Sequence, residues 1–361
     1  MRTPTPGAAA SDAAEAAPGL RVVAIGGGTG LSTLLQGLGQ HVRLVTEPGP
    51  RPFIADLSAV VTVTDDGGSS GRLRKELNIL PPGDIRNCIV ALSQDQALLS
   101  RLFQYRFRGD SALDGHSFGN LFLAALTGVT GDFAQAVELS SAILSTRGHI
   151  YPATTANVEL EARMDDGSRV RGETAITGSQ RRIVQLQLVP GDVQPLPPTL
   201  QALGNADLIT IGPGSLFTSL IPNVLVRGIP EAIAASRATK IYICNLMTQA
   251  NESLGLTAAD HIRALYQHAG REIFDFALLN RTPASFTLKA KYALEGASAI
   301  VADPGEVEDL GVTPMLGDYL LEEAGVARHD TTRVARDLLA VASGAVARSP
   351  VGASDPAASG Q

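Results

Sequence analysis

The chain has 361 residues, enough for one large domain or two ordinary ones, and its 44% hydrophobic and 18% charged residues can supply a buried core. The net charge is −7, and no basic run with interleaved aromatic residues occurs, so nucleic acid is not an expected partner. No apolar run reaches the roughly 18 residues of a membrane span, and the N-terminus does not read as a secretory signal. We therefore expect a cytoplasmic protein in which Cys88 and Cys244 are reduced core residues.

Short apolar runs alternate with helical patterns along most of the chain. Strands are expected at 21–25, 59–64, 207–211, 240–244 and 274–279, and helices at 84–93, 118–127, 133–145, 257–268 and 331–342. Such alternation predicts an α/β fold, a Rossmann-like and mainly parallel sheet with helices on both faces. Residues 150–195 differ, because period-two alternation around Asp166-Gly167 predicts a small antiparallel β-hairpin insertion.

The expected domain organisation is a single α/β domain over residues 20–343 that contains this insertion. Residues 1–19 and 344–361 are rich in Ala, Pro, Ser and Gly, and we expect them to be disordered tails. Residues 46–56 are expected to form a Pro-containing loop inserted between the first helix and the second strand.

The first expected strand runs into a glycine loop, Gly26-Gly27-Gly28-Thr29-Gly30, followed by leucines at helical spacing. A strand that turns through glycines into a helix leaves unpaired backbone N–H groups around a concavity, which suits a phosphate or diphosphate. Leu31 stands where a dinucleotide fingerprint needs its third glycine, so a mononucleotide or nucleotide diphosphate fits better than NAD. The alternative is a tight turn without a ligand.

The second expected strand leads into Asp65-Asp66-Gly67-Gly68-Ser69-Ser70-Gly71-Arg72. Open α/β sheets bind ligands beyond the carboxyl ends of their strands, so we expect Asp65 and Asp66 beside the first glycine loop. They form the one acid pair in the sequence that could hold Mg²⁺ next to a diphosphate. Mg²⁺ is the only cofactor that the sequence suggests, and no metal-ligand set is predicted.

Two more polar motifs open expected helices. In Pro81-Pro82-Gly83-Asp84-Ile85-Arg86-Asn87, Asp84 is either an N-cap or a site residue, and Arg86 and Asn87 are candidate ligand contacts. In His116-Ser117-Phe118-Gly119-Asn120, His116 and Asn120 are candidates for the same pocket. The alternative for the histidine is a satisfied structural group.

The C-terminal half repeats the strand-to-glycine-loop pattern at Gly212-Pro213-Gly214-Ser215, where the backbone could hold a second phosphate and Ser215 would cap the next helix. Asn245, Thr248 and Gln249 follow another strand, and their side chains suit a base or ribose edge or else form turn hydrogen bonds. Arg328, expected at the start of the last helix, could contact a phosphate bidentately. No nucleophile triad, HExxH, CxxC pair or P-loop occurs, so no catalytic residue is assigned.

Six of these motifs, in this order, resemble the YvcK family, often labelled gluconeogenesis factor, within the wider CofD-like group. They are GGGTGL at 26–31, DDGGSSGRLR at 65–74, PPGDIRN at 81–87, HSxGN at 116–120, GPGSLFTS at 212–219 and CNLMTQ at 244–249, and the resemblance runs from about Val22 to about Leu339.

The resemblance implies a Rossmann-like cytoplasmic protein that binds UDP-sugars such as UDP-N-acetylglucosamine or UDP-glucose. It also implies a requirement for cell shape and envelope synthesis during gluconeogenic growth, with envelope-synthesis proteins as partners, and we expect a homo-oligomer. In such proteins a tyrosine and an arginine near the C-terminus line the nucleotide-sugar pocket, and Tyr292 and Arg328 match them. The complete predicted ligand-binding set is Gly26, Gly27, Gly28, Thr29, Gly30, Asp65, Asp66, Arg86, Asn87, His116, Asn120, Gly212, Gly214, Ser215, Asn245, Thr248, Tyr292 and Arg328.

The chain departs from the family after Gln249, where Pro-Gly-Glu-Thr is usual and Ala250-Asn251-Glu252-Ser253 stands instead; Asn251 can still adopt a left-handed conformation. The alternative function is that of CofD proteins, 2-phospho-L-lactate transferases that move a phospho-group from a nucleotide diphosphate donor to a deazaflavin. We favour a non-catalytic nucleotide-sugar sensor. The acidic loop reads like YvcK, and 4% aromatic residues with no tryptophan offer little surface for stacking a deazaflavin.

Overall fold

The computed structural model of the chain describes residues 19–43, 52–94 and 98–344. Of the expected tails at 1–19 and 344–361, all but residues 19 and 344 lie outside these residues, as does most of the loop expected at 46–56. Within them, no helix is both long and apolar enough to cross a membrane.

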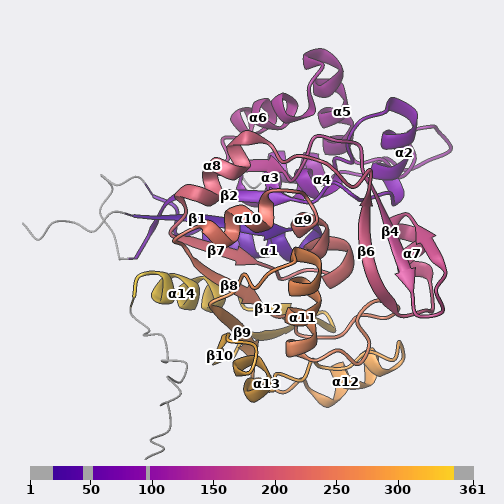
Figure 1. Ribbon diagram of the computed structural model, residues 1–361. Coiled ribbons are helices and arrows are strands. Elements are labelled where there is room, and N and C mark those ends of the chain that lie inside the picture. The colour runs from indigo at the N-terminus through magenta and orange to yellow at the C-terminus, as the bar shows by residue number, and fades with distance from the viewer. Residues whose placement is uncertain (1–18, 44–51, 95–97, 345–361) are drawn as a thin grey trace, which may run out of the picture.

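A seven-stranded parallel sheet in the order β10-β9-β8-β7-β1-β2-β3 forms the centre of the molecule (Figure 1). Its strands are β1 (Leu20–Gly26), β2 (Ile54–Val61), β3 (His149–Pro152), β7 (Leu208–Ile211), β8 (Thr239–Ile243), β9 (Phe276–Asn280) and β10 (Thr313–Gly317). The α/β class is confirmed. The chain winds from β1 toward β3 on one side and from β7 toward β10 on the other, so the direction of winding changes between β1 and β7.

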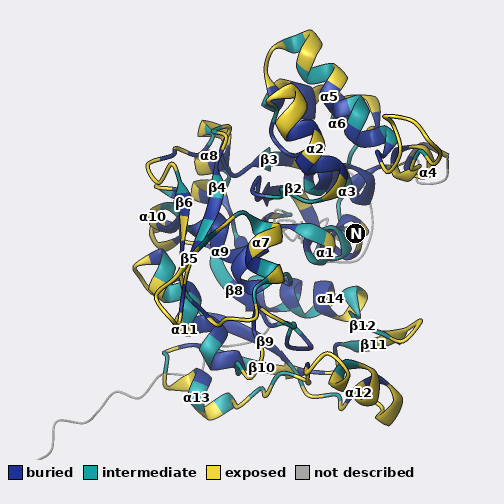
Figure 2. Ribbon diagram, turned by 90° about the vertical axis from the view of Figure 1, so that its right-hand side faces the viewer, coloured by how far each residue is buried: buried dark blue, intermediate teal, exposed yellow. Residues whose placement is uncertain are grey.

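Helices cover both faces of the sheet (Figure 2). One face carries α1 (Gly28–Gly39), α3 (Gly83–Leu92) and α14 (Thr331–Ala342), and the other carries α8 (Pro197–Asn205), α10 (Ile229–Ala235) and α11 (Ala258–Ala269). The central strands are buried on both sides, which explains why they read as continuous Val, Ile and Leu runs. That continuity made β1, β7, β8 and β9 predictable from the sequence.

Further helices extend the fold beyond the central layers. Next to α3 lie α2 (Gly68–Leu77), α4 (Leu98–Gln104), α5 (Phe118–Thr130) and α6 (Phe133–Ile143). Shorter elements are α7 (Glu173–Gly178), the π-helix η1 (Leu216–Leu220), α9 (Ile221–Val224), α12 (Phe286–Ala293) and α13 (Pro304–Glu308).

Two small antiparallel sheets complete the structure. The predicted insertion is present as β4 (Glu159–Met164), β5 (Arg169–Arg171) and β6 (Ile183–Val189), with Gly167 of the turn at a φ of 83°. It begins later than the expected residue 150, because residues 150–152 belong to β3, which pairs parallel with β2 in the central sheet. The second sheet, the hairpin β11 (Leu320–Glu323) and β12 (Val326–His329), was not predicted.

Three boundary predictions are wrong. The strand expected at 59–64 is Ile54–Val61; its exposed Ala55 and Asp56 interrupt the apolar run that a sequence reading relies on. Residues 54–56 therefore belong to a strand and not to the inserted loop. Arg328 lies in β12 and does not start the last helix, which begins at Thr331.

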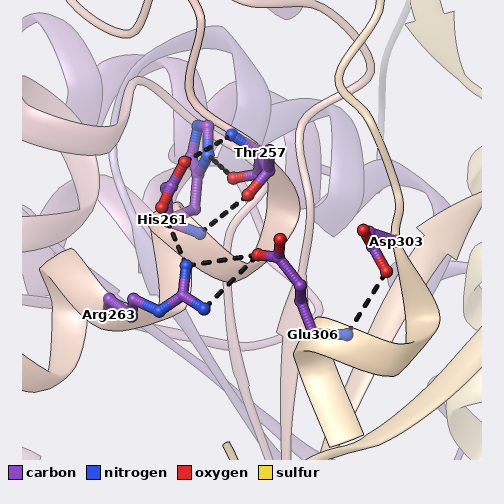
Figure 3. A network of polar contacts seen from close by, with 6 residues as sticks. Thr257, His261, Arg263, Asp303 and Glu306 are labelled. Atoms are coloured by element: carbon purple, nitrogen blue, oxygen red, sulfur yellow. Dashed lines mark hydrogen bonds and ion pairs between the residues drawn. The ribbon is translucent and has the colours of Figure 1, made fainter. Parts of the chain in front are cut away.

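A polar network joins α11 to α13 at the surface (Figure 3). The Arg263 guanidinium contacts Asp260 Oδ1 at 2.9 Å and Glu306 Oε2 at 3.3 Å, and the Asp303 side chain caps α13 through the Glu306 N–H. Thr257 caps α11 by accepting from the Asp260 N–H. These contacts fix the segment that leads into β10.

Two helical glycines give a matched test of the packing of α1 on α14. A Cβ at Gly37 would lie 2.7 Å from the Thr331 carbonyl oxygen, whereas a Cβ at Gly128 of α5 would meet nothing within 4 Å. Alanine favours a helix over glycine by about 0.5–1 kcal/mol. We expect Gly128→Ala to raise the melting temperature and Gly37→Ala to lower it, because the backbone of α14 must move. Equal shifts in thermal unfolding would contradict this packing.

Candidate functional site

Two glycine loops meet where the winding of the sheet reverses. β1 pairs with β7 so that Ile25 lies beside Ile211, and each strand then runs into its loop. A Cβ at Gly30 would stand 2.3 Å from the Pro213 carbonyl oxygen, so only glycine permits this approach. Open α/β sheets bind ligands at such a switch point.

The N-terminus of α1 opens at this point. Gly27 is its N-cap and supplies no side-chain cap, and the Gly28 N–H donates to Asp84 Oδ2 at 2.7 Å. The N–H groups of Thr29 and Gly30 belong to the first turn, where a helix offers no backbone acceptor. Two donors at the positive end of the helix dipole are therefore available to an anion.

A cavity of about 560 Å³, here called the main cavity, lies in front of these loops. This volume falls within the roughly 300–1,000 Å³ of small-ligand sites. Its lining consists of Gly27, Gly28, Thr29, Gly30, Thr33, Pro213, Gly214, Ser215, Ser219, Asn245, Leu246, Met247, Thr248, Gln249, Ala250, Tyr292, Glu295, Ala297, Ala327, Arg328 and His329.

Helix α12 and the β11–β12 hairpin form one wall of the main cavity, and they lie side by side in Figure 2. The Ser285 side chain caps α12, and its N–H and hydroxyl donate to the Glu322 carboxylate at 2.6 Å each. The Tyr292 hydroxyl accepts from the Ala327 N–H at 3.2 Å. The hairpin thus holds the tyrosine ring in place.

Arg328 and His329 project from β12 into the same wall. Among the described residues, no ion pair involves Arg328. His329 Nε2 donates to the Cys244 carbonyl oxygen at 3.1 Å, and burial lowers the pKa of the imidazole to about 4. The histidine is therefore neutral at physiological pH, and the arginine is a cation that forms no ion pair within the described part of the chain.

Side chains of the 245–252 segment brace the second glycine loop. Asn245 accepts from the Gly214 N–H at 3.0 Å and donates to the Gly214 carbonyl at 2.7 Å, and Gln249 donates to Ser215 Oγ at 2.9 Å. The Asn245 amide is thus engaged with the loop, as in the turn alternative. Ser215 does not cap the following helix with its side chain, contrary to the prediction.

Glu252 provides the cap that Ser215 does not. Its buried Oε1 accepts from the N–H groups of Phe217 and Thr218 at 2.8 and 2.9 Å. Asn251 adopts a φ of 60°, the left-handed conformation expected of it, which lets the chain turn without the family's Pro-Gly. The substituted segment therefore keeps a capping carboxylate.

A second group of predicted residues lies outside the main cavity. Asp84 is not an N-cap, because Pro82 occupies that position and the carboxylate instead reaches Gly28. Asp65 accepts from the Gly67 N–H at 2.9 Å, and Asp66 accepts from the Thr174 N–H and hydroxyl at 2.8 and 2.6 Å. The acidic loop therefore joins α7 to the carboxyl end of β2.

The helix starts of α2, α3 and α5 meet in a buried network beside this loop. Ser69 Oγ lies 2.9 Å from His116 Nδ1 and accepts from the Asn120 amide at 3.1 Å. Arg86 donates to Ser117 Oγ at 2.6 Å and to Asn87 Oδ1 at 2.7 Å. His116 and Asn120 thus bond to α2, and Arg86 bonds to the start of α5 and to Asn87 of its own helix. This matches the structural alternative for the histidine.

Carboxylates crowd the border between this network and the glycine loop. Burial, with the nearby Asp65, raises the pKa of Asp84 to about 6, and burial with the neighbouring acids raises that of Glu173 to about 9. Within the described part of the chain, no three His, Cys, Asp or Glu side chains are placed to hold a metal ion together.

Ten of the eighteen predicted residues line the main cavity, and Gly26, Asp65, Asp66, Arg86, Asn87, His116, Asn120 and Gly212 do not. The sequence analysis left out several lining residues, among them Thr33, Glu295 and Ala327. Ala327 precedes Arg328 in β12, a strand that the sequence did not predict.

Comparisons with known proteins agree with this architecture. Residues 22–320 match the family model described as 2-phospho-L-lactate transferase CofD. The chain is 47% identical to a gluconeogenesis factor of Halalkalibacterium halodurans, covering 88% of this chain and 95% of the relative. It is 46% identical to the Bacillus subtilis gluconeogenesis factor, covering 87% and 96%. A crystal structure of a Bacillus halodurans protein superposes with a TM-score of 0.84 at 46% identity, over 89% of this chain and all of the other.

The raised pKa of Asp84 predicts a specific pH dependence of stability. The folded protein binds this proton more tightly than the unfolded chain, so stability falls as the pH rises from about 4 to about 6. In Asp84→Asn the amide oxygen can still accept from Gly28, but no charge is buried. We expect the variant to gain on the order of 2–3 kcal/mol relative to wild type between pH 4 and 7.5, measured by urea unfolding.

The control is Asp110→Asn, which removes an exposed carboxylate. Its stability relative to wild type should change little over the same range. A pH-independent loss of stability in Asp84→Asn would show instead that Asp84 acts only through its hydrogen bond to Gly28.

Proposed function

This chain belongs to the gluconeogenesis factor family within the CofD group, and on that premise we propose that it binds a UDP-sugar in the main cavity and acts as a regulatory factor without catalysing a reaction. The role would be in cell morphogenesis and envelope synthesis during gluconeogenic growth. The proposal includes a cytoplasmic location, assembly into a homo-oligomer and downstream partners among envelope-synthesis proteins.

One observation carries the proposal: the first turn of α1 and the guanidinium of Arg328, which has no ion-pair partner among the described residues, line the same cavity. Backbone N–H groups at a helix start and an arginine are complementary to the two negative phosphates of a diphosphate. Each group alone would bind a small anion weakly. Because both line the main cavity, they offer complementary groups to both phosphates of one diphosphate.

The remaining lining suits the two ends of a nucleotide sugar. The Tyr292 ring is held by its hydroxyl, and apolar side chains of Leu246, Met247 and Ala297 continue the wall. An aromatic face with apolar neighbours can pack against a planar base. Thr33, Ser219 and Glu295 provide polar groups for hydroxyls.

The chemistry of the lining favours binding over catalysis. The His329 imidazole has a pKa of about 4 and is fixed by the Cys244 carbonyl, so it is a weak base at neutral pH. General acid–base catalysis works best with a group whose pKa lies near the operating pH.

A transferase remains the second candidate because of Asp84. Its carboxylate bonds to the glycine loop, and its pKa of about 6 is near that of a general base. A CofD-type reaction would need such a group close to the acceptor hydroxyl. The two functions therefore differ in whether a bound donor is consumed.

The first test removes the cation in the cavity wall. Charge-assisted hydrogen bonds contribute about 1.5–3 kcal/mol, so Arg328→Ala should weaken binding of UDP-N-acetylglucosamine roughly 10- to 150-fold in calorimetry. The control is Arg227→Ala, which removes an exposed arginine paired with Asp192. The proposed diphosphate position is wrong if both variants bind like wild type. Loss of complementation by Arg328→Ala, in a deletion strain on a gluconeogenic carbon source, would connect binding to the cellular role.

The second test asks whether any reaction occurs. Wild-type protein with UDP-N-acetylglucosamine, with or without Mg²⁺, should leave the phosphorus NMR spectrum of the ligand unchanged over hours while calorimetry detects binding. A GDP-linked donor with a deazaflavin acceptor is the parallel sample. Steady donor cleavage that disappears in Asp84→Asn would establish the transferase in place of the sensor.

A further inference from the structure

A second cavity of about 260 Å³ lies at the carboxyl ends of β8 and β9. It shares Asn245 and Leu246 with the main cavity but is otherwise formed by different residues. The rest of its lining is Cys244, Leu279, Asn280, Arg281, Thr282, Pro283, Ala284, Lys289, Ala299, Ile300 and Ala302. Of the six motifs that resemble the family, only CNLMTQ contributes to it, through residues 244–246.

The charged side chains that line this cavity have one sign. Arg281 and Lys289 line it, and no aspartate or glutamate does. Arg281 pairs with Asp318 at 3.1 Å, outside the lining, whereas no ion pair within the described part of the chain involves Lys289. In a chain with a net charge of −7, a concave surface lined only by cations is selective for anions.

The uncharged part of the lining limits what kind of anion fits. Leu246, Leu279 and Ile300 give an apolar wall. The polar side chain of Asn280 is already engaged, because it donates to the Thr282 carbonyl and accepts from the Thr282 N–H. A ligand with a short hydrocarbon body and a terminal anion would therefore match this surface better than a sugar would.

Helix α12 connects the two cavities. Lys289 lines the second cavity, and Tyr292, three residues later on the same helix, lines the main one. The helix is fixed at its start by Ser285 and Glu322, and Lys291 donates to the Gly325 carbonyl of the β11–β12 turn at 2.7 Å. A shift of α12 at one cavity would therefore displace Tyr292 and Arg328 at the other.

We propose that the second cavity binds a small organic anion, a phosphate monoester or a carboxylate with a short carbon chain, through Lys289. Occupancy changes the affinity of the main cavity through α12. Binding of the anion is independent of the proposed function, and only the coupling rests on it. By linkage, a nucleotide sugar in the main cavity changes the affinity for the anion by the same factor.

The test titrates glycerol 3-phosphate and butanoate separately into wild-type protein, with ligand-observed NMR and calorimetry as readouts. We expect at least one probe to bind saturably, and we expect Lys289→Gln to lower the affinity for that probe at least tenfold. Lys75→Gln, which removes an exposed lysine on α2, is the matched control and should bind like wild type. The probe that binds identifies the anion as phosphate or carboxylate.

A steric variant checks the position of the probe without changing charge. Ala284 is buried in the lining, and Ala284→Leu should fill the cavity and abolish binding. Lys289→Gln, at an exposed position, keeps the proposal testable if Ala284→Leu fails to fold. Absence of saturable binding by both probes, or unchanged binding in folded Lys289→Gln, overturns the proposal.

Coupling is measured as the affinity for UDP-N-acetylglucosamine with and without saturating probe. A change in wild type that disappears in Lys289→Gln supports the connection through α12, and an unchanged affinity overturns the coupling. Arg328→Ala separates the two sites. This variant should weaken binding of the nucleotide sugar and leave direct binding of the probe unchanged. Failure of the proposed function is therefore distinguishable from failure of the anion site.

Discussion

The carboxyl edge of the sheet depends on a backbone contact that only glycine allows. At Gly30 the first turn of α1 lies so close to the Pro213 carbonyl that a Cβ would stand 2.3 Å away. At Gly27, a Cβ would lie 2.5 Å from the Thr62 side chain, on the opposite side of the loop. These contacts hold the start of α1 between the ends of β2 and β7. Thus the glycines do more than form a tight turn, because they set where the helix dipole points.

The charges at this edge are divided between two sides. Asp84 occupies the Gly28 N–H and has further carboxylates behind it, whereas Arg328 and the free first-turn N–H groups face the main cavity. An anionic ligand is repelled by the first side and attracted by the second. For the proposed diphosphate, the bond between Asp84 and Gly28 would limit how deeply a phosphate enters the loop and favour a ligand that extends toward the β11–β12 hairpin.

The sequence predicted the elements whose signals are local. Buried strands read as apolar runs, and β1, β7, β8 and β9 were found in that way, as was the hairpin at Asp166-Gly167. It did not reveal which residue pairs with which across the fold. From the sequence, the Asn245 amide suits the edge of a base or a turn equally well. In the structure its two hydrogen bonds to Gly214 place it in the turn. The β11–β12 hairpin was missed because its strands are short and half-exposed, with little apolar alternation.

Because the sequence does not show which residues contact each other across the fold, it also did not show which predicted site residues line the main cavity and which lie behind it. A polar residue at a helix start has one sequence signature whether it contacts a ligand or another helix. Arg86 and Asn120 belong to the second kind, since they bond to residues at the starts of α5 and α2. By bringing three helix starts together, these side chains support the acidic loop, whose Asp66 in turn holds α7. Motifs whose side chains hold the helices next to the main cavity, without lining it, can therefore be as characteristic of the fold as the motifs that line it.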